Sequence, residues 1–175
     1  YTEMESKGYK FYSASGVEMD CPALMKSLGF NSLRFRVWVN PKERWNGKED
    51  VLKKCLRAKE LGMKIMIDFH YSDTWADPGK QNVPAAWTSY DLEALAKAVA
   101  DHTSDVLNTL KDNGVDITWV QVGNEVTNGM LWEKGRVKDQ SASGFAKLFK
   151  AGADQVKAVY PGASVILHID NAWKM

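Results

Sequence analysis

Apolar helical segments and apolar strand segments alternate along this chain, and a glycine lies near each point where a helix gives way to a strand. These glycines are Gly29, Gly62, Gly114 and Gly162. Glycine commonly ends a helix because it adopts the left-handed backbone conformation without steric cost. Strands that alternate with helices in this way form parallel sheets through right-handed crossovers. The pattern therefore predicts an α/β protein with the order helix, then strand and helix three times, then strand.

Four strands are expected, and they occupy residues 32–39, 63–70, 119–124 and 164–170. The first alternates, so that one face is apolar and the other carries Arg34, Arg36 and Trp38. The second is almost continuously apolar, as expected of a strand that is buried on both faces of a parallel sheet.

Three aspartates are expected to cap helices, because a short carboxylate accepts hydrogen bonds from the free N–H groups of a first helical turn. They are Asp20, Asp50 and Asp91. Residues 1–19 contain turn signals and predict an irregular segment before the first helix.

Size and composition predict one globular domain that spans residues 1–175. The net charge of +1 gives no sign of a nucleic-acid partner, and no apolar run reaches the length of a membrane span. No leader peptide is visible at the start of the chain. Cys21 and Cys55 both fall in expected helices and are interpreted as buried free thiols.

Polar and aromatic residues gather at the carboxyl end of every expected strand. They are Arg36, Trp38, Asp68, His70, Asn124, Glu125, His168, Asp170 and Asn171. No strand leads into a glycine-rich nucleotide-binding turn. Four such strand ends favour a (β/α)8 TIM barrel over an open sheet. A whole barrel typically has about 250 residues, so we expect this chain to supply about half of one. The rest is either missing or contributed by another chain.

Glu125 is the best candidate for a general acid, and Asn124 beside it can hold a substrate hydroxyl without adding charge. The alternative is that both residues only begin a turn. Arg36 could orient a second carboxylate, or it could form an interior ion pair with Asp68. His70 and a second strand-end histidine could bind hydroxyls, or they could be satisfied structural groups.

The histidines and carboxylates lack the spacing of a metal site, and no nucleophile elbow of a serine hydrolase is present. Instead, tryptophans are frequent in the expected loops: Trp38, Trp45, Trp75, Trp87, Trp132 and Trp173. Flat aromatic rings that line a cleft suit the apolar faces of sugars. Glycoside hydrolysis requires two carboxylates that flank the scissile bond.

Three segments then resemble glycoside hydrolase family 53, the endo-β-1,4-galactanases. They read DFHYSDTWADPGKQ at residues 68–81, RFRVWVNP at residues 34–41 and VQVGNE at residues 120–125. The first is similar to the signature loop of that family, and the others are similar to its second and fourth strands. The resemblance implies a retaining barrel glycosidase that cuts β-1,4-galactan and type I arabinogalactan, a component of pectin. It also implies that this chain contains strands two to five of the barrel.

The resemblance also implies roles for individual residues. The acid/base of the family falls on Glu125. Substrate-binding roles fall on Arg36, His70, Trp75, Asp77, Trp87, Asn124, His168 and Asn171. The first strand of the family would precede Tyr1. Its nucleophile, a glutamate at the end of strand seven, would follow Met175 and is therefore expected outside this chain. An inverting arrangement with Asp170 as base would require carboxyl groups roughly 6.5–9.5 Å apart and is not favoured.

The expected partner is the polysaccharide, without a cofactor, metal ion, nucleic acid or membrane span. A polymeric substrate implies a secreted, periplasmic or cell-surface protein. The oligomeric state stays open, although the exposed strand edges of a half-barrel favour self-association. Two alternatives remain: a galactan-binding barrel fragment without catalysis, and a glycosidase of the same barrel type that acts on another β-linked glycan.

Overall fold

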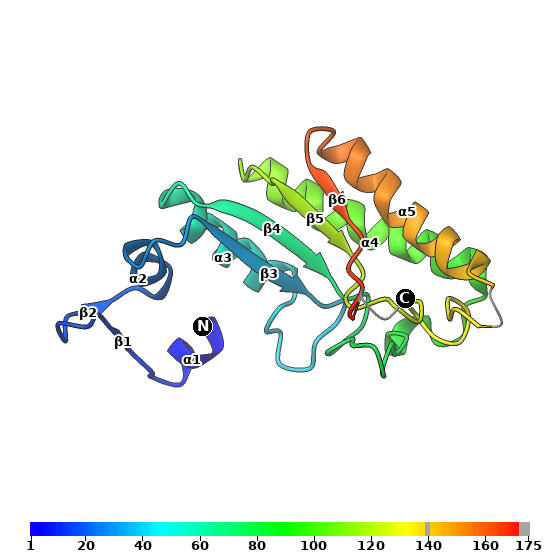
Figure 1. Cartoon of the computed structure of the whole chain (residues 1–175), viewed down its shortest axis with the longest axis horizontal. Helices are drawn as coiled ribbons and strands as arrows, with labels where there is room; N and C mark the ends of the chain where they lie inside the picture. The colour runs from blue at the N-terminus through cyan, green and yellow to red at the C-terminus, as the bar shows by residue number, and fades with distance from the viewer. Residues whose placement is uncertain (139–140, 172–175) are drawn as a thin grey trace.

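A four-stranded parallel sheet forms the centre of the protein (Figure 1). The computed structural model describes residues 1–138 and 141–171. The strands lie in the order β3-β4-β5-β6, and all three pairings are parallel. Their bounds are Ser32–Val37 for β3, Lys64–Phe69 for β4, Trp119–Val122 for β5 and Ser164–Ile166 for β6. The predicted parallel sheet is confirmed, with β3 and β6 as its two edges.

Three helices cover one face of this sheet (Figure 1). They are α3 (Lys48–Glu60), α4 (Leu92–Asp112) and α5 (Ser143–Val159). Apolar side chains of the strands, such as Phe35, Ile67 and Val122, are buried in the core with those of the helices. The opposite face of the sheet carries polar side chains and leads to the site described below.

The first nineteen residues are more regular than the sequence predicted. They form α1 (Thr2–Ser6) and the antiparallel strands β1 (Phe11–Tyr12) and β2 (Glu18–Met19). The turn signals at residues 6–8 lie at the end of α1, and those at residues 13–16 lie between the two short strands, where Ser13 N–H donates to the carbonyl of Val17 at 2.9 Å. Helix α2 (Cys21–Ser27) follows and leads into β3.

Two of the three predicted helix caps are confirmed. The Asp20 carboxylate accepts from the third backbone N–H after it at 3.1 Å, and Asp91 does the same at 2.8 Å. The prediction for Asp50 is wrong, because α3 begins at Lys48, with Gly47 as its N-cap. Asp50 instead lies in the first turn, where it forms a salt bridge with Lys54 at 2.5 Å. Its carboxylate also accepts from the backbone N–H of Asn46 at 2.7 Å, so it binds an N–H group before the helix rather than one of the first turn.

Each strand ends earlier than predicted, most clearly β6, which ends at Ile166 rather than at residue 170. The polar groups that follow the strands therefore lie in loops at the carboxyl edge of the sheet. The loop after β4 contains the short 3-10 helix η1 (Ala85–Trp87). Trp173 lies outside the described residues.

Cys21 and Cys55 are buried free thiols, as predicted. Within residues 1–138 and 141–171, no helix combines the length and apolar character needed to cross a membrane.

Candidate active site

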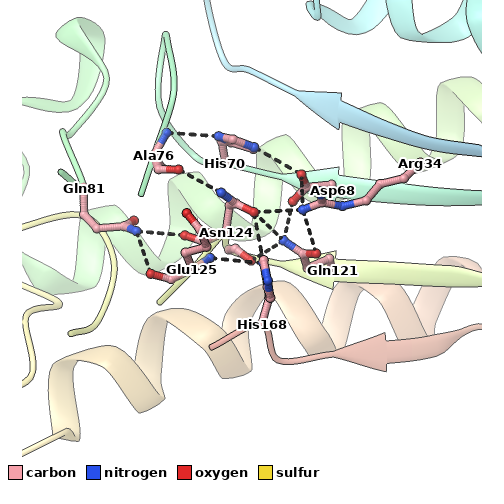
Figure 2. Close-up of polar contacts among 10 residues, drawn as sticks. Arg34, Asp68, His70, Ala76, Gln81, Gln121, Asn124, Glu125 and His168 are labelled. Carbon is pink, nitrogen blue, oxygen red and sulfur yellow. Dashed lines mark hydrogen bonds and ion pairs between the residues drawn. The ribbon is translucent and has the colours of Figure 1, made fainter. Parts of the chain in front are cut away.

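The inner face of the sheet and the loops at its carboxyl edge converge on one polar network (Figure 2). Arg34 on β3, Asp68 on β4 and Gln121 on β5 project from the face that the helices leave open. Asn124 and Glu125 follow β5 directly, and His168 follows β6. Side chains from four strands and their loops are thus brought together, as the sequence predicted for a barrel rim.

Asp68 is the centre of this network and is only 1% exposed. Its carboxylate pairs with Arg34 at 2.8 Å, contacts His70 Nε2 at 3.1 Å and accepts from Gln121 Nε2 at 2.5 Å. A buried carboxylate requires such partners because its desolvation is otherwise costly. The predicted interior ion pair is therefore real, but its cation is Arg34 and not Arg36.

Arg36 lies beside the network under an aromatic cover. Its guanidinium carbon is 3.8 Å from the ring centroid of Trp75, which is 49% exposed. The ring of Trp38 meets Trp75 edge-on, with centroids 6.2 Å apart. The pKa of Arg36 is lowered, chiefly because the guanidinium is partly buried. The negative charge of Asp68 opposes this shift, and the positive charge of Arg34 adds to it. The result is a flat cationic and aromatic surface of the kind that stacks on a neutral ring.

His70 is buried and has both ring nitrogens occupied. Its Nδ1 accepts from the backbone N–H of Ala76 at 3.0 Å, which leaves the ring proton on Nε2 to donate to Asp68. These contacts correspond to the structural alternative for this residue. They also link the loop after β4 to the end of the strand.

Asn124 is 4% exposed and is held from both ends of its amide. Its Oδ1 accepts from Arg34 at 2.8 Å and from Gln121 at 3.1 Å, while its Nδ2 donates to the carbonyl of Ala76 at 2.8 Å. His168 Nδ1 lies 3.1 Å from the same Oδ1. So many fixed partners distinguish Asn124 from a residue that merely begins a turn.

Glu125 occupies the left-handed backbone region, with a φ of 49°. Its backbone N–H faces His168 Nδ1 at 3.4 Å. Within the described part of the chain, its carboxylate forms no hydrogen bond or salt bridge. The carboxyl group is therefore available to act on a bound molecule, whereas the carboxylate of Asp68 is fully engaged.

The other predicted site residues are more peripheral. Asp77 accepts from the N–H of Gly79 at 2.9 Å and stabilises a turn. Trp87 is 8% exposed and packs edge-on against His102 of α4, so the structure places it in the core rather than beside Asn124 and Glu125. Asn171 is exposed near the end of the described chain and donates to Asp170 at 2.5 Å.

Three residues of the site were not predicted from the sequence. Arg34 shares a strand face with Arg36, and Gln121 lies three positions before Asn124, so strand periodicity offered a weak signal for both. Gln81 lies in the loop after β4, and the only signal for it was its place at the end of the segment that resembles the family's signature loop. It is 2% exposed, and its Nε2 donates to the carbonyl of Asn124 at 2.8 Å.

Among residues 1–138 and 141–171, no three histidine, cysteine or acidic side chains are grouped as metal ligands would be. The described site is built from carboxylates, amides, arginines, histidines and aromatic rings. This combination suits a neutral, hydroxyl-rich ligand and proton transfer to it.

A parallel sheet with helices on one face and its polar site at the carboxyl ends of the strands defines a class, the (β/α)8 barrel, of which this chain supplies about half. The chain belongs to glycosyl hydrolase family 53, whose sequence profile matches residues 1–175.

Similar structures and sequences agree with this membership. The family 53 catalytic domain of Ignisphaera aggregans superposes with a TM-score of 0.89 and 34% identity, over 95% of this chain and 48% of that one. A chain from a study of two fungal β-1,4-galactanases superposes with a TM-score of 0.92 and 34% identity, over 98% of this chain and 52% of that one. An arabinogalactan endo-β-1,4-galactanase of Humicola insolens is 36% identical over 174 residues, 97% of this chain and 51% of that protein. The chain spans about half the length of the curated relatives it matches.

Proposed function

We propose that residues 1–175 form part of the catalytic barrel domain of a retaining endo-β-1,4-galactanase, which hydrolyses galactan and type I arabinogalactan. The observation that carries the proposal is the pair at the end of β5. Glu125 presents a carboxylate without a partner among the described residues, and the amide of Asn124 next to it is fixed by Arg34 at 2.8 Å. The substrate is taken from the fungal relatives, which are named as arabinogalactan endo-β-1,4-galactanases.

In this mechanism Glu125 is the acid/base. It protonates the glycosidic oxygen as the bond breaks and then removes a proton from the water that hydrolyses the glycosyl-enzyme. Asn124 holds a sugar hydroxyl beside the reacting carbon. The nucleophile is a glutamate outside these 175 residues. The two neighbouring aspartates are occupied, Asp68 by Arg34 and Asp170 by Thr127 and Asn171.

Sugar binding is assigned to the more accessible residues of the same edge. Trp75 offers an exposed ring, and Arg36 beneath it adds donors. His168 borders the turn at Glu125 from the side of β6, and Asn171 lies three residues further along the same loop. His70 and Asp77 keep the loop after β4 in place under the sugar. Because the substrate is a polymer outside the cell, we place the enzyme in the secreted, periplasmic or cell-surface space.

The test measures reducing-end release from linear β-1,4-galactan, with a β-glucan and a β-mannan as controls. The 175-residue chain and the natural full-length product are assayed side by side. We expect only the full-length product to cut galactan. Cleavage by the short chain would mean that a carboxylate within it is the partner of Glu125. Galactan binding without cleavage by either form favours the binding-protein alternative, and cleavage of a control glycan reassigns the substrate.

The substitution Glu125→Gln keeps the size of the side chain but removes its ability to give up and regain a proton. We expect turnover on galactan to fall by roughly 10²- to 10⁴-fold, the usual contribution of a general acid–base. Binding of galactan, measured separately by affinity electrophoresis, is expected to stay within about threefold of wild type. Unchanged turnover would remove Glu125 from the mechanism.

A further inference from the structure

The carboxamide of Gln81 connects the loop after β4 to the turn after β5. Its Nε2 donates to the carbonyls of Asp77 at 3.1 Å, Asn124 at 2.8 Å and Glu125 at 3.4 Å. An amide nitrogen has two protons, so the longest of these contacts shares a proton with another. Figure 2 shows the Gln81 side chain directed at the backbone of Asn124 and Glu125. Gln81 therefore binds the main chain at the very residues that carry the proposed chemistry.

The turn that Gln81 contacts contains two residues in the left-handed backbone conformation, and this conformation is unfavourable for the second of them. Gly123 has a φ of 84°, and Glu125, which is not a glycine, has a φ of 49°. A left-handed conformation costs a residue with a Cβ roughly 1–2 kcal/mol. Such a conformation persists only where its surroundings hold it. The surroundings here include the two carbonyl contacts from Gln81 and the approach of His168 Nδ1 to the N–H of Glu125 at 3.4 Å.

The direction of the Glu125 side chain depends on this backbone. Its carboxylate has no hydrogen-bond or ionic partner among residues 1–138 and 141–171 that would otherwise orient it. A rotation of the peptide units on either side would therefore redirect the acid. Proton transfer requires the donor within hydrogen-bond reach of the leaving oxygen, and a displacement of about 1 Å can cost 10²-fold in rate.

We propose that Gln81 is a positioning residue for Glu125: by holding the carbonyls on both sides of this residue, its carboxamide sets the direction in which the acid/base points. This inference rests on the proposed function, in which Glu125 protonates the leaving group. Gln81 itself touches neither substrate nor reacting atoms. It acts through the main chain of the turn.

The chemistry of the three acceptors selects the test variants. Gln81→Met keeps the length of the side chain but has no donor, and Gln81→Glu presents oxygens to carbonyl oxygens. Asn128→Ala is the matched control, because the Asn128 amide also joins the two loops. It donates to the carbonyl of Pro78 at 3.2 Å and, among residues 1–138 and 141–171, forms no hydrogen bond with Asn124 or Glu125. All variants are made in the full-length enzyme, and turnover is expressed per folded molecule.

Two substrates separate positioning of the acid from general damage. Galactan has a poor leaving group that requires protonation, whereas a 2,4-dinitrophenyl β-galactobioside loses its aglycone without it. For Gln81→Met we expect kcat/KM on galactan to fall about ten- to hundredfold. We expect kcat/KM on the aryl substrate to change less than threefold. Gln81→Glu is expected to lose more on galactan, and Asn128→Ala is expected to match wild type on both substrates.

Equal losses on both substrates, or no loss on galactan, would overturn the inference and leave Gln81 a packing residue. If Gln81→Met fails to fold, the same comparison is made with Gln81→Asn, whose amide is one methylene short of the carbonyls. Glu125→Gln is assayed in parallel. Full activity in that variant would refute the proposed function, whereas its loss together with an unchanged Gln81→Met refutes only the role of Gln81.

Discussion

Arg34 forms the ion pair with Asp68, at 2.8 Å, although the strand register places Arg36 opposite Asp68. The register partner of Arg34 is Met66, so its side chain reaches along the inner face toward the carboxyl edge. Arg36 meanwhile lies over the ring of Trp75. Two arginines on one strand face therefore have different tasks: one fixes the polar network, and the other forms part of the open surface.

Replacing Arg34 by Met removes the cation that holds Asp68 and the Oδ1 of Asn124. We expect kcat on galactan to fall about 10²-fold, because Asn124 loses its fixed orientation next to the reacting bond. Arg36→Met, the matched change two residues on, is expected to raise KM and to alter kcat less. Steady-state kinetics of the two variants in the full-length enzyme separate these effects. The opposite assignment, with kcat lost at Arg36 and KM changed at Arg34, would contradict the contacts.

The two loop tryptophans are expected to respond differently to truncation because only one is exposed. Trp75→Ala should weaken galactan binding and leave the unfolding free energy nearly unchanged. Trp87→Ala should instead lower that free energy by about 3–5 kcal/mol, the usual cost of deleting a buried aromatic side chain. Urea unfolding and galactan affinity are measured for both variants. A stable Trp87→Ala protein with weakened binding would return Trp87 to the sugar site.

Gly152 allows α5 to approach the sheet closely. A Cβ at this position would lie 2.7 Å from the Tyr71 hydroxyl and 2.8 Å from Val122 Cγ1. We expect Gly152→Ala to lower the free energy of unfolding by about 1–3 kcal/mol, because overpacking outweighs the higher helix propensity of alanine. Gly162→Ala, where an added Cβ meets no atom within 4 Å, serves as the control. Equal stability of both variants in urea unfolding would show that α5 can move away at little cost.

His102 is expected to make stability depend on pH. Its Nε2 is buried without a hydrogen-bond partner among the described residues, and its ring lies edge-on to Phe69, Tyr71 and Trp87. Burial lowers the pKa of His102 to about 4, from an ordinary value of about 6.5. The unfolded chain therefore binds a proton between these two pH values, whereas the folded chain does not.

It follows that lowering the pH from about 6.5 to about 4 should destabilise the fold by up to about 1.4 kcal/mol per pH unit from this histidine alone. Above that window its contribution is constant. Asp105 and Asp73 oppose the shift, and Lys48 adds to it. His102→Phe should flatten this part of the pH dependence in urea unfolding. If the unfolding free energy of variant and wild type changed equally with pH, His102 would take up a proton as readily in the folded state as in the unfolded state.

From residue 20 onward, the order of strands and α-helices followed from local pattern alone. Apolar periodicity and the glycines after the helices predicted the parallel sheet, and the caps at Asp20 and Asp91 were confirmed because a short carboxylate binds the N–H groups nearest to it in sequence. The cap at Asp50 failed because α3 begins two residues earlier, which places Asp50 inside the first turn, where it pairs with Lys54. The clustering of polar residues at the carboxyl edge was also predictable, since parallel strands all end on the same side.

The pairings within that cluster were decided only by the tertiary structure. Arg34 and Asn124 are separated by 90 positions, and no sequence pattern shows which of two arginines reaches the amide. Gln81 and the turn at Glu125 meet because two loops fold over each other at the end of the sheet. Local periodicity fixes the face on which a side chain lies. The partner that a long side chain reaches depends on strand register, on neighbouring rings such as Trp75, and on the need of each buried polar atom for a partner.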